Sequence, residues 1–349
     1  MNLSRLFEIV NKLNALLPYY GMDGKAFLPF RIYFELTDRC NFSCTNCCQR
    51  SQQYNKKKDE ELTFNQVTSL IDKLPKRAVI IFSGGEPMIR KDFFDIINYS
   101  SGNFKTGFIT NGSMLNESSL NKIKNSNLIF LGISIDSLQD ETNLKLGRNI
   151  LNHSLLKKSI INNNIRNKIS IIDIKTTLYD QTEEEILNIY SYARSINADY
   201  FTLSLPKMNS YQFNSKLFSL GELLRFENNC ESINLNILRF EKLKKVVEEI
   251  TLNKGNLRGP KLRIYPKIKK ASLFSQKPLM YKPCMEPWTG LSIRTNGDVY
   301  PCLSVKIGSM LNSSFKEVWN SKNYKLFRSE LRKRKFLNVC DGCCYAYIK

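Results

Sequence analysis

Residues 30–48 read FRIYFELTDRCNFSCTNCC, an apolar, strand-like run that leads directly into closely spaced cysteines. Cys40, Cys44 and Cys47 form a C-x3-C-x2-C triplet. Thiolates suit zinc and iron–sulfur clusters, and a structural metal site normally closes with four protein ligands. The triplet is one ligand short, which indicates a metal centre with a position kept open for another molecule.

A second motif follows about forty residues further along the chain. Residues 78–87, AVIIFSGGEP, end an apolar strand in two glycines, an acid and a proline. Gly84 and Gly85 have no Cβ, so the backbone can turn sharply and approach a ligand closely. Backbone carbonyls and the Glu86 carboxylate would accept hydrogen bonds from a ligand ammonium group, and Pro87 would stiffen the exit.

The two motifs, in this order and at this distance, resemble those of the radical S-adenosylmethionine (SAM) enzymes. In that family three cysteines bind a [4Fe-4S] cluster, and the amino and carboxylate groups of SAM chelate its fourth iron. The resemblance implies that Cys40, Cys44 and Cys47 hold this cluster and that residues 84–87 hold the methionine end of SAM. One electron passed to the sulfonium would then give a 5′-deoxyadenosyl radical, which takes a hydrogen atom from an unactivated carbon.

The chain departs from the family pattern beside the third cysteine. An aromatic residue usually precedes that cysteine and packs near the adenine, whereas this chain has Asn46. Cys48 is a further thiol next to the triplet, and as a fourth ligand it would close a zinc knuckle. Two interpretations therefore remain: an open iron–sulfur site, which the pair of motifs favours, and a structural zinc site.

The segment between residues 30 and 206 alternates apolar, strand-like runs with helix-like stretches. This alternation predicts repeated βα units around a parallel sheet. Helical periodicity covers residues 63–72, and Thr182 is a predicted N-cap for a helix over residues 183–190. Six such units match the partial (β/α)6 barrel of the radical SAM family. We expect strands at 30–37, 77–83, 105–110, 128–135, 168–178 and 199–205.

In parallel α/β folds the carboxyl ends of the strands carry the chemistry, and both motifs lie at predicted strand ends. Ser134-Ile-Asp136-Ser137 ends the fourth strand. In similar enzymes a serine at this position and a following arginine help to hold SAM, and Ser134 with Arg148 match them. The alternative for Arg148 is a solvated helix face. The remaining strand ends, Thr110-Asn-Gly112, Lys175-Thr-Thr177 and Ser204-Leu-Pro206, are further candidates.

The last seventy or so residues hold five of the ten cysteines, namely Cys284, Cys302, Cys340, Cys343 and Cys344. Cys340 and Cys343 flank a tight turn, so both thiolates can ligate the same metal centre. Residues 295–298, TNGD, predict a hairpin turn that would bring Cys284 and Cys302 together. Four thiolates close a site.

This segment resembles the twitch/SPASM extension of radical SAM enzymes, which carries auxiliary [4Fe-4S] clusters. A full SPASM domain uses seven cysteines for two clusters, so five cysteines indicate one auxiliary cluster. The resemblance implies that Cys284, Cys302, Cys340 and Cys343 are its ligands and that Cys344 is spare. The alternative is a four-cysteine zinc ribbon, because spacing alone does not separate tetrahedral zinc from a cubane.

We expect four segments along the chain. They are a helical N-terminal extension at 1–29, the partial barrel at 30–206, a helical linker that covers the substrate at 207–280, and the auxiliary cluster domain at 281–349. Helix-like pieces within the linker lie at 219–229 and 238–251. The lone Cys230 is best interpreted as a small buried residue; the sharper hypothesis is a hydrogen-atom donor that quenches a substrate radical.

Length and composition exclude several classes of protein. With 349 residues, 42% of them hydrophobic, the chain can form one large and one small globular domain. No apolar stretch is long enough to cross a bilayer and no signal peptide begins the chain, so we expect a cytoplasmic protein with thiolate ligands and no membrane partner. The net charge is +20, yet no RNA-binding motif accompanies it. We therefore expect no nucleic-acid partner, and the basic surface would suit an acidic electron donor of the flavodoxin or ferredoxin type.

The sequence thus predicts a radical SAM enzyme that abstracts a substrate hydrogen and oxidises or rearranges the substrate with help from an auxiliary [4Fe-4S] cluster. The substrate would be a small molecule, such as a sugar or cyclitol, or a peptide. Only about thirty residues precede the first predicted strand, fewer than a leader-binding domain of about eighty residues needs, which favours a small molecule. The alternatives are a maturase that cross-links or epimerises a ribosomally made peptide, and a non-enzymatic zinc or redox-sensing protein.

Overall fold

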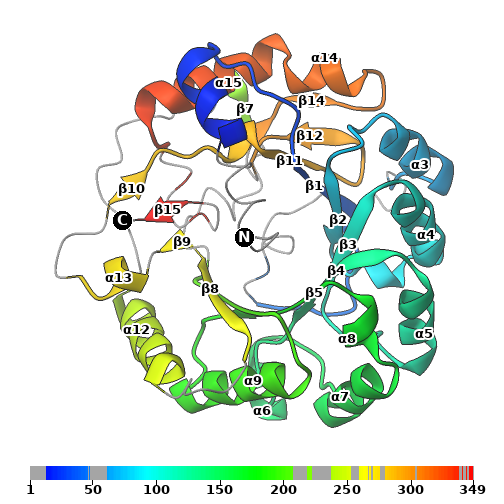
Figure 1. The fold of residues 1–349 in the computed structure, drawn as a ribbon, viewed down its shortest axis with the longest axis vertical. Helices are drawn as coiled ribbons and strands as arrows, with labels where there is room; N and C mark the ends of the chain where they lie inside the picture. Colours follow the sequence, from blue (N-terminus) through cyan, green and yellow to red (C-terminus); the bar gives the residue numbers. More distant parts are fainter. Residues whose placement is uncertain are drawn as a thin grey trace.

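The computed structural model describes residues 13–45, 47, 61–206, 218–221, 237–252, 259–265, 267–268, 270–275, 280–302, 305–337, 340, 343 and 346–348. Its centre is a ten-stranded sheet in the order β14-β12-β11-β1-β2-β3-β4-β5-β6-β8. Every neighbouring pair from β11 to β8 is parallel. The sheet curves, and the helices that connect its parallel strands lie on the convex outer face (Figure 1). It does not close, as expected for a partial barrel.

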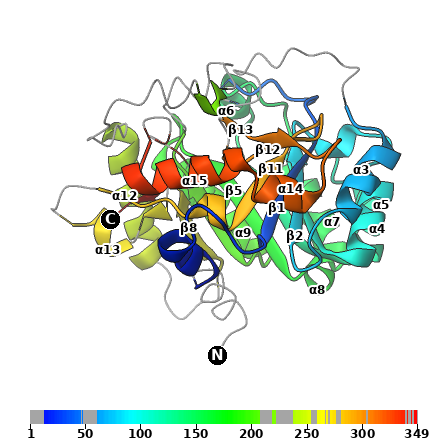
Figure 2. The ribbon, with the colours of Figure 1, turned by 90° about the horizontal axis from the view of Figure 1, so that it is seen from above.

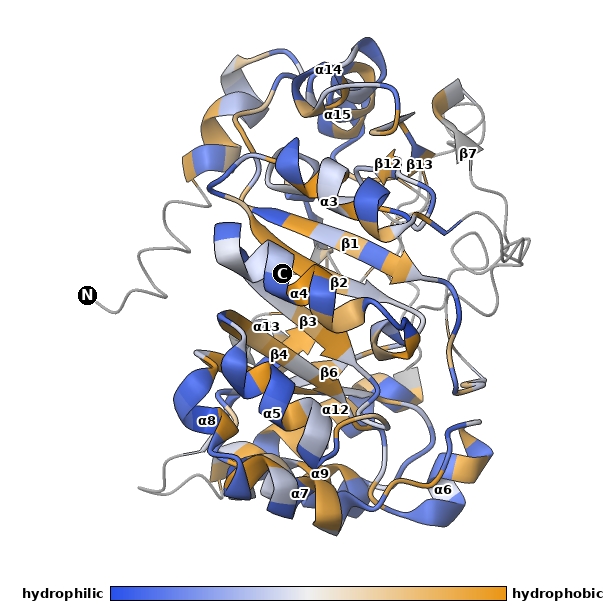
Figure 3. Ribbon diagram, turned by 90° about the vertical axis from the view of Figure 1, so that its right-hand side faces the viewer, coloured by the Kyte–Doolittle hydropathy of each residue, from blue (hydrophilic) through white to orange (hydrophobic). Residues whose placement is uncertain are grey.

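Six of the parallel strands confirm the prediction from the sequence. Along each strand, successive side chains point alternately to the helices and to the inside of the curve. In β5, for example, Ile172 and Ile174 are fully buried on the helix side. Figure 3 shows the apolar residues concentrated along the central strands. The six are β1 (Arg31–Thr37), β2 (Val79–Gly84), β3 (Lys105–Thr110), β4 (Leu128–Ser134), β5 (Ile171–Thr177) and β6 (Tyr200–Ser204).

The outer layer consists of amphipathic helices with clear start signals. Thr63 caps α3 through a capping box with Gln66, and Thr182 caps α9 through a capping box with Glu185, which confirms both predicted helix starts. The helices of the barrel are α3 (Phe64–Asp72), α4 (Phe93–Asn103), α5 (Glu117–Asn125), α6 (Asp140–Lys145), α7 (His153–Asn162), α8 (Ile165–Lys168) and α9 (Glu183–Ser195). No helix among the described residues is long and apolar enough to cross a membrane.

The segment after β6 differs from the prediction in two places. Lys261–Tyr265 forms β8, a seventh parallel strand beside β6. The helix expected at 238–251 is present as α12 (Ile237–Leu252). Phe218–Ser219 forms β7, which pairs with β13 (Val305–Lys306), and the helix expected from residue 219 begins one residue later, at residue 220. Residues 222–230 lie outside the described residues. Pairing with a distant strand decides both positions, and local periodicity does not contain that information.

The C-terminal segment continues the same sheet. β11 (Gly290–Ile293) and β12 (Asp298–Tyr300) form the predicted antiparallel hairpin, and the Arg294 N–H donates to the Asp298 carbonyl at 2.8 Å. β14 (Gly308–Ser309) follows β12 at the sheet edge. β11 lies parallel to β1, and a buried ion pair joins their ends: Arg294 Nη1 lies 2.7 and 2.6 Å from the two carboxylate oxygens of Glu35.

Two further groups of elements surround this hairpin. A helical segment at residues 13–21 packs on it, with the rings of Tyr19 and Trp288 4.9 Å apart, and α14 (Phe315–Trp319) and α15 (Lys322–Arg334) lie beside it (Figure 2). A separate small sheet combines β10 (Tyr281–Lys282), β15 (Tyr347–Ile348) and β9 (Lys267–Ile268). The remaining short elements are η2 (Pro87–Ile89), α13 (Lys270–Leu273) and η3 (Glu286–Trp288). The four-segment division of the chain remains a prediction.

Candidate functional site

The cysteine triplet lies in the loop that leaves the carboxyl end of β1. Cys40 is exposed, and Cys44 and Cys47 are half-buried. The Cys47 N–H donates to the Cys44 carbonyl at 3.2 Å, which folds the loop back on itself. Burial raises the pKa of the Cys44 thiol to about 11, Arg148 opposes the rise, and Cys47 and Cys40 add to it. The three thiols are therefore close enough to influence one another, and a bound metal centre would stabilise their thiolate forms.

A segment that follows α6 holds this loop in place. The Ser43 N–H donates to the Gly147 carbonyl, and the Thr45 N–H donates to the Leu146 carbonyl, each at 3.0 Å. Gly147 has a φ of +70°, and a Cβ there would lie 2.4 Å from the Ser43 carbonyl oxygen. Glycine is needed both for that conformation and for the close approach. The position of the cysteines thus depends on a turn about a hundred residues further along.

Gly84 and Gly85 pack against the entrance to the cysteine loop. The Gly85 N–H donates to the Thr37 carbonyl at 2.7 Å, and the Glu86 N–H donates to the Arg39 carbonyl at 2.9 Å. A Cβ on Gly84 would lie 2.3 Å from the Thr37 oxygen, and one on Gly85 would lie 2.0 Å from the Arg39 oxygen. Among the described residues, the close approach that requires these glycines is therefore to protein backbone.

The Glu86 carboxylate accepts hydrogen bonds from protein groups, whereas the sequence predicted a ligand ammonium group as its donor. Its side chain is fully buried and accepts hydrogen bonds from Thr110 Oγ1 (2.9 Å), the Asn111 N–H (2.7 Å) and the Met88 N–H (3.1 Å). Burial raises its pKa, although these three donors work in the opposite direction. The carboxylate therefore joins the ends of β2 and β3. This places the predicted strand end at Thr110 in the site, as a support for Glu86.

Arg148 lies inside the site and is not on a solvated helix face. Its guanidinium donates to the Ser134 carbonyl at 2.6 Å and to the Asp136 carboxylate, and it lies over the Phe42 ring. Burial alone would lower the pKa of Arg148. The neighbouring Asp136 and Cys44 act in the opposite direction and outweigh it, so the pKa is raised. The structure thus brings Arg148 together with Ser134 and with the cysteine loop. Asp136, which fixes the guanidinium, belongs to the candidate strand end at residues 134–137, but the sequence assigned no role to it.

The C-terminal cysteines converge through pairing of the segments around them. The strand β10 leads to Cys284 and pairs with β15, which follows Cys343. The Cys284 N–H donates to the Lys335 carbonyl at 3.4 Å, and the Cys343 N–H donates to the Cys340 carbonyl at 2.9 Å, which forms the predicted turn. Burial raises the pKa of Cys284 to about 12, and Cys302 contributes to the rise because it lies nearby. These thiols suit a metal centre whose charge would stabilise their thiolate forms.

Several positions singled out in the sequence lie outside the described residues: Asn46, Cys48, Cys230 and Cys344. Within the described part of the chain, no three His, Cys, Asp or Glu side chains are grouped to hold a single metal ion. A cubane binds each cysteine at a different iron, so its sulfur atoms are spaced more widely than those around one ion.

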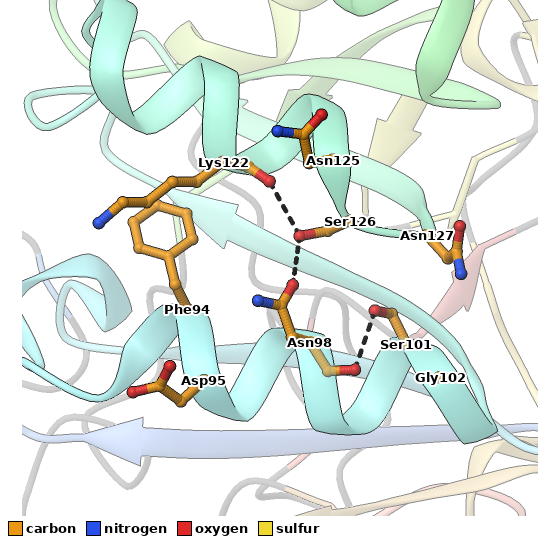
Figure 4. A pocket seen from close by; sticks show the side chains of 9 residues that line it. All are labelled: Phe94, Asp95, Asn98, Ser101, Gly102, Lys122, Asn125, Ser126 and Asn127. Atoms are coloured by element: carbon orange, nitrogen blue, oxygen red, sulfur yellow. Dashed lines mark hydrogen bonds between the residues drawn. The ribbon is translucent and has the colours of Figure 1, made fainter.

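A pocket of about 500 Å³ lies on the outer surface between α4 and α5 (Figure 4). Asn98 and Ser101 line it from the last turns of α4, and Lys122 and Ser126 line it from the end of α5. These helix ends precede β3 and β4, so the pocket lies at the amino ends of the strands. It is therefore separate from the cysteine loop, which lies at the carboxyl ends.

The unclosed parallel sheet, with a cysteine loop and its supports at the carboxyl edge, defines a mixed α/β fold of the radical SAM type. Residues 34–193 match the radical SAM superfamily, and residues 284–344 match the SPASM family of iron–sulfur cluster-binding domains. The chain therefore carries a radical SAM domain followed by a SPASM domain. These domains imply SAM and a [4Fe-4S] cluster in the first and additional iron–sulfur clusters in the second.

Known proteins of several activities are similar to this chain. It is 34% identical over 125 residues to the S-adenosylmethionine-dependent nucleotide dehydratase of Selenomonas ruminantium, an alignment that covers 34% of this chain and only 44% of that protein. It is 24% identical over 346 residues to the AdoMet-dependent heme synthase of Methanosarcina barkeri, covering 90% and 91% of the two chains. The crystal structure of Streptococcus suis SuiB bound to precursor peptide SuiA superposes with a TM-score of 0.66 and 16% identity, covering 94% of this chain and 72% of that one. At that identity the superposition shows a shared fold.

Proposed function

We propose that this chain is an oxidoreductase or maturase that cleaves SAM reductively, abstracts a substrate hydrogen atom, and oxidises or rearranges the substrate. The observation that carries the proposal is the packing of the cysteine loop against both Gly84–Glu86 and the segment that bears Arg148. This packing gathers three thiols, a buried guanidinium and a strand-end turn at one edge of the sheet. Such a set suits a cluster with one open iron and a zwitterionic ligand beside it.

Each residue of the site has a proposed role. Cys40, Cys44 and Cys47 would hold the first [4Fe-4S] cluster, and residues 84–87 with Ser134 and Arg148 would hold SAM. Glu86 would act as a positioning residue, because its carboxylate oxygens already accept hydrogen bonds from Thr110, Asn111 and Met88. When bound, the cluster and SAM supply a 5′-deoxyadenosyl radical after one electron arrives from a flavodoxin- or ferredoxin-type donor.

Cys284, Cys302, Cys340 and Cys343 would hold one auxiliary [4Fe-4S] cluster. When bound, it supplies either an acceptor for the electron that a substrate radical loses or an anchor for the substrate. The hairpin that carries Arg294 supports this role, since it joins the auxiliary segment to β1, the strand that leads to the first cysteine loop.

The test is the formation of 5′-deoxyadenosine by the reconstituted, reduced protein in the presence of SAM. We expect the wild type and Cys48→Ala to form it and Cys44→Ala to give only background. Cys44→Ala should also lower bound iron by about four atoms per chain. Bound zinc in place of iron, with no 5′-deoxyadenosine, would establish the zinc or redox-sensing alternative. Loss of activity in Cys48→Ala with retention in Cys47→Ala would reassign the third ligand.

A second candidate is maturation of a ribosomally made peptide by cross-linking or epimerisation. The superposition with the peptide-bound SuiB structure supports it through the fold alone. The first candidate remains a small molecule such as a sugar or cyclitol. Incubation with SAM and the precursor peptides or small molecules encoded near the gene would separate the two, with products measured by mass spectrometry. For epimerisation, Cys230→Ala tests the quenching hypothesis, because full turnover by this variant excludes it.

A further inference from the structure

Four residues form a row across the carboxyl half of the sheet. Ser134 of β4 is in register with Lys175 of β5, Lys175 with Thr202 of β6, and Thr202 with Arg263 of β8. Neighbouring strands are about 4.8 Å apart, so residues in register on parallel strands are direct neighbours. One end of the row is Ser134, whose carbonyl binds Arg148. The row therefore begins at the proposed SAM site and extends away from it.

The row lies on the concave face of the sheet. Lys175 Cε would lie 3.2 Å from a Cβ on Gly132, and Lys175 Nζ lies 6.0 Å from the centre of the Phe130 ring. Tyr33 and Tyr265 both influence Lys175 electrostatically. Ile174 faces the helices, so Lys175, the next residue along β5, faces the inside of the curve. Its exposed fraction is 26%, and that of Arg263 is 34%.

The Asp173 carboxylate forms ion pairs with both Lys175 and Arg263. Its side chain is completely buried. Oδ1 accepts a hydrogen bond from Thr202 Oγ1 at 2.7 Å, and Oδ2 lies 3.0 Å from Lys175 Nζ and 3.6 Å from Arg263 Nη1. The Oδ2 contacts are ion pairs and not well-aligned hydrogen bonds, so the cationic N–H groups are not all committed to Asp173. Arg263 Cζ also lies over the Tyr200 ring, 3.1 Å from its centre, and this contact helps to hold the guanidinium in place.

Lys175, Arg263 and Asp173 together carry one excess positive charge. Among the residues that the structure describes, Lys175 and Arg263 form ion pairs with one carboxylate only, that of Asp173. Burial works against the charge of Lys175, but Asp173 outweighs it and the pKa of Lys175 is raised, so the ammonium stays protonated. Two partly buried cations that share one carboxylate are incompletely neutralised, and burying unbalanced charge is costly. One excess positive charge matches a singly charged anion, and a guanidinium and an ammonium are the groups that bind carboxylates.

We propose that Lys175 and Arg263 bind a carboxylate group of the substrate on the concave face of the sheet. This inference rests on the proposed function, and it restricts the substrate to one that carries a carboxylate, whether a small acid or a peptide. Asp173 is then a positioning residue that orients both cations. Bound there, the carboxylate would fix one end of the substrate near the edge where Ser134 and Arg148 lie.

The experiment uses trifluoroacetate as a carboxylate probe of the reconstituted full chain with SAM bound. Its fluorine line width is measured by nuclear magnetic resonance, with trifluoroacetamide as the neutral control. We expect saturable broadening for trifluoroacetate alone, displaced by acetate. Loss of one charge-assisted hydrogen-bond donor in Lys175→Met or Arg263→Met should weaken binding about tenfold. Lys175→Arg keeps the charge and should retain binding. Lys333→Met, on the outer helix α15 and 71% exposed, should match the wild type.

Two results would overturn the inference. One is binding in both methionine variants that equals binding in the wild type. The other is displacement of the probe by inorganic phosphate at about tenfold lower concentration than by acetate, since this would assign the site to a phosphate group. Formation of 5′-deoxyadenosine is measured in the same samples. Its absence in the wild type would refute the proposed function, whereas its presence together with either result above refutes only the carboxylate assignment.

Discussion

Replacement of Gly85 by alanine should damage the site by a purely steric route. The added Cβ would lie 2.0 Å from the Arg39 carbonyl oxygen and 2.5 Å from its carbon, and both atoms are backbone. To restore an ordinary 3.4 Å contact, the start of the cysteine loop must move by about 1.4 Å. A shift of this size breaks the hydrogen bonds from Gly85 N to Thr37 and from Glu86 N to Arg39.

Two contributions determine how far the free energy of unfolding should fall. Each lost backbone hydrogen bond contributes about 1 kcal/mol net, and overpacking a closely packed site costs about 1–3 kcal/mol. The expected fall in the free energy of unfolding is therefore about 3–5 kcal/mol. Urea titration of the iron-free protein measures it. Iron content and 5′-deoxyadenosine formation after reconstitution report whether the displaced loop still assembles the site, and we expect both to fall.

The matched control is Gly102→Ala. Gly102 lies in the last turn of α4, and no atom lies within 4 Å of the position where its Cβ would be. Alanine is favoured over glycine in a helix by about 0.5–1 kcal/mol, so this variant should be as stable as the wild type or more stable. A Gly85→Ala protein within about 1 kcal/mol of the wild type, with normal iron content, would refute the steric argument.

Two further substitutions test the supports of the site. Arg294→Met leaves the Glu35 carboxylate buried without this ion pair and should lower the free energy of unfolding in urea by about 3–5 kcal/mol. If the unpaired charge is the cause, the double variant Arg294→Met with Glu35→Gln should recover most of this loss. An unchanged loss in the double variant would contradict that explanation. Arg148→Lys cannot reach both Asp136 and the Ser134 carbonyl, so SAM affinity, measured by equilibrium dialysis, should fall about tenfold while bound iron stays constant; equal SAM affinity would remove Arg148 from the SAM site.

The sequence predicts those parts of the fold that depend on local patterns. The six strands from β1 to β6 follow from apolar runs, and the starts of α3 and α9 follow from Thr63 and Thr182 with their capping partners. β8 was missed because KLRIY is short and joins the sheet only through its pairing with β6. The place of β11 beside β1 was also missed, since no local signal specifies a parallel partner so far along the chain.

The residues of the site also separate into those that local motifs predict and those that only strand pairing brings together. The cysteines and the glycine pair stand out because their residue types and spacing are unusual. The support of Glu86 by Thr110 and Asn111 could not be predicted, because it depends on the end of β2 meeting the end of β3. The row that contains Lys175 and Arg263 depends on the register of four strands, and the sequence of a single strand does not determine its register.

The pairing of β1 with β11 has a consequence for how the protein folds during synthesis. Glu35 and Arg294 are 259 residues apart, so one edge of β1 has no partner until β11 has left the ribosome. An unpaired strand edge is a site for aggregation or wrong pairing, and contacts of such long sequence separation form slowly. The strand that carries the first cysteine loop is thus the last strand of the barrel to gain both neighbours. A cysteine loop supported by both neighbours of β1 therefore forms only after β11 has left the ribosome.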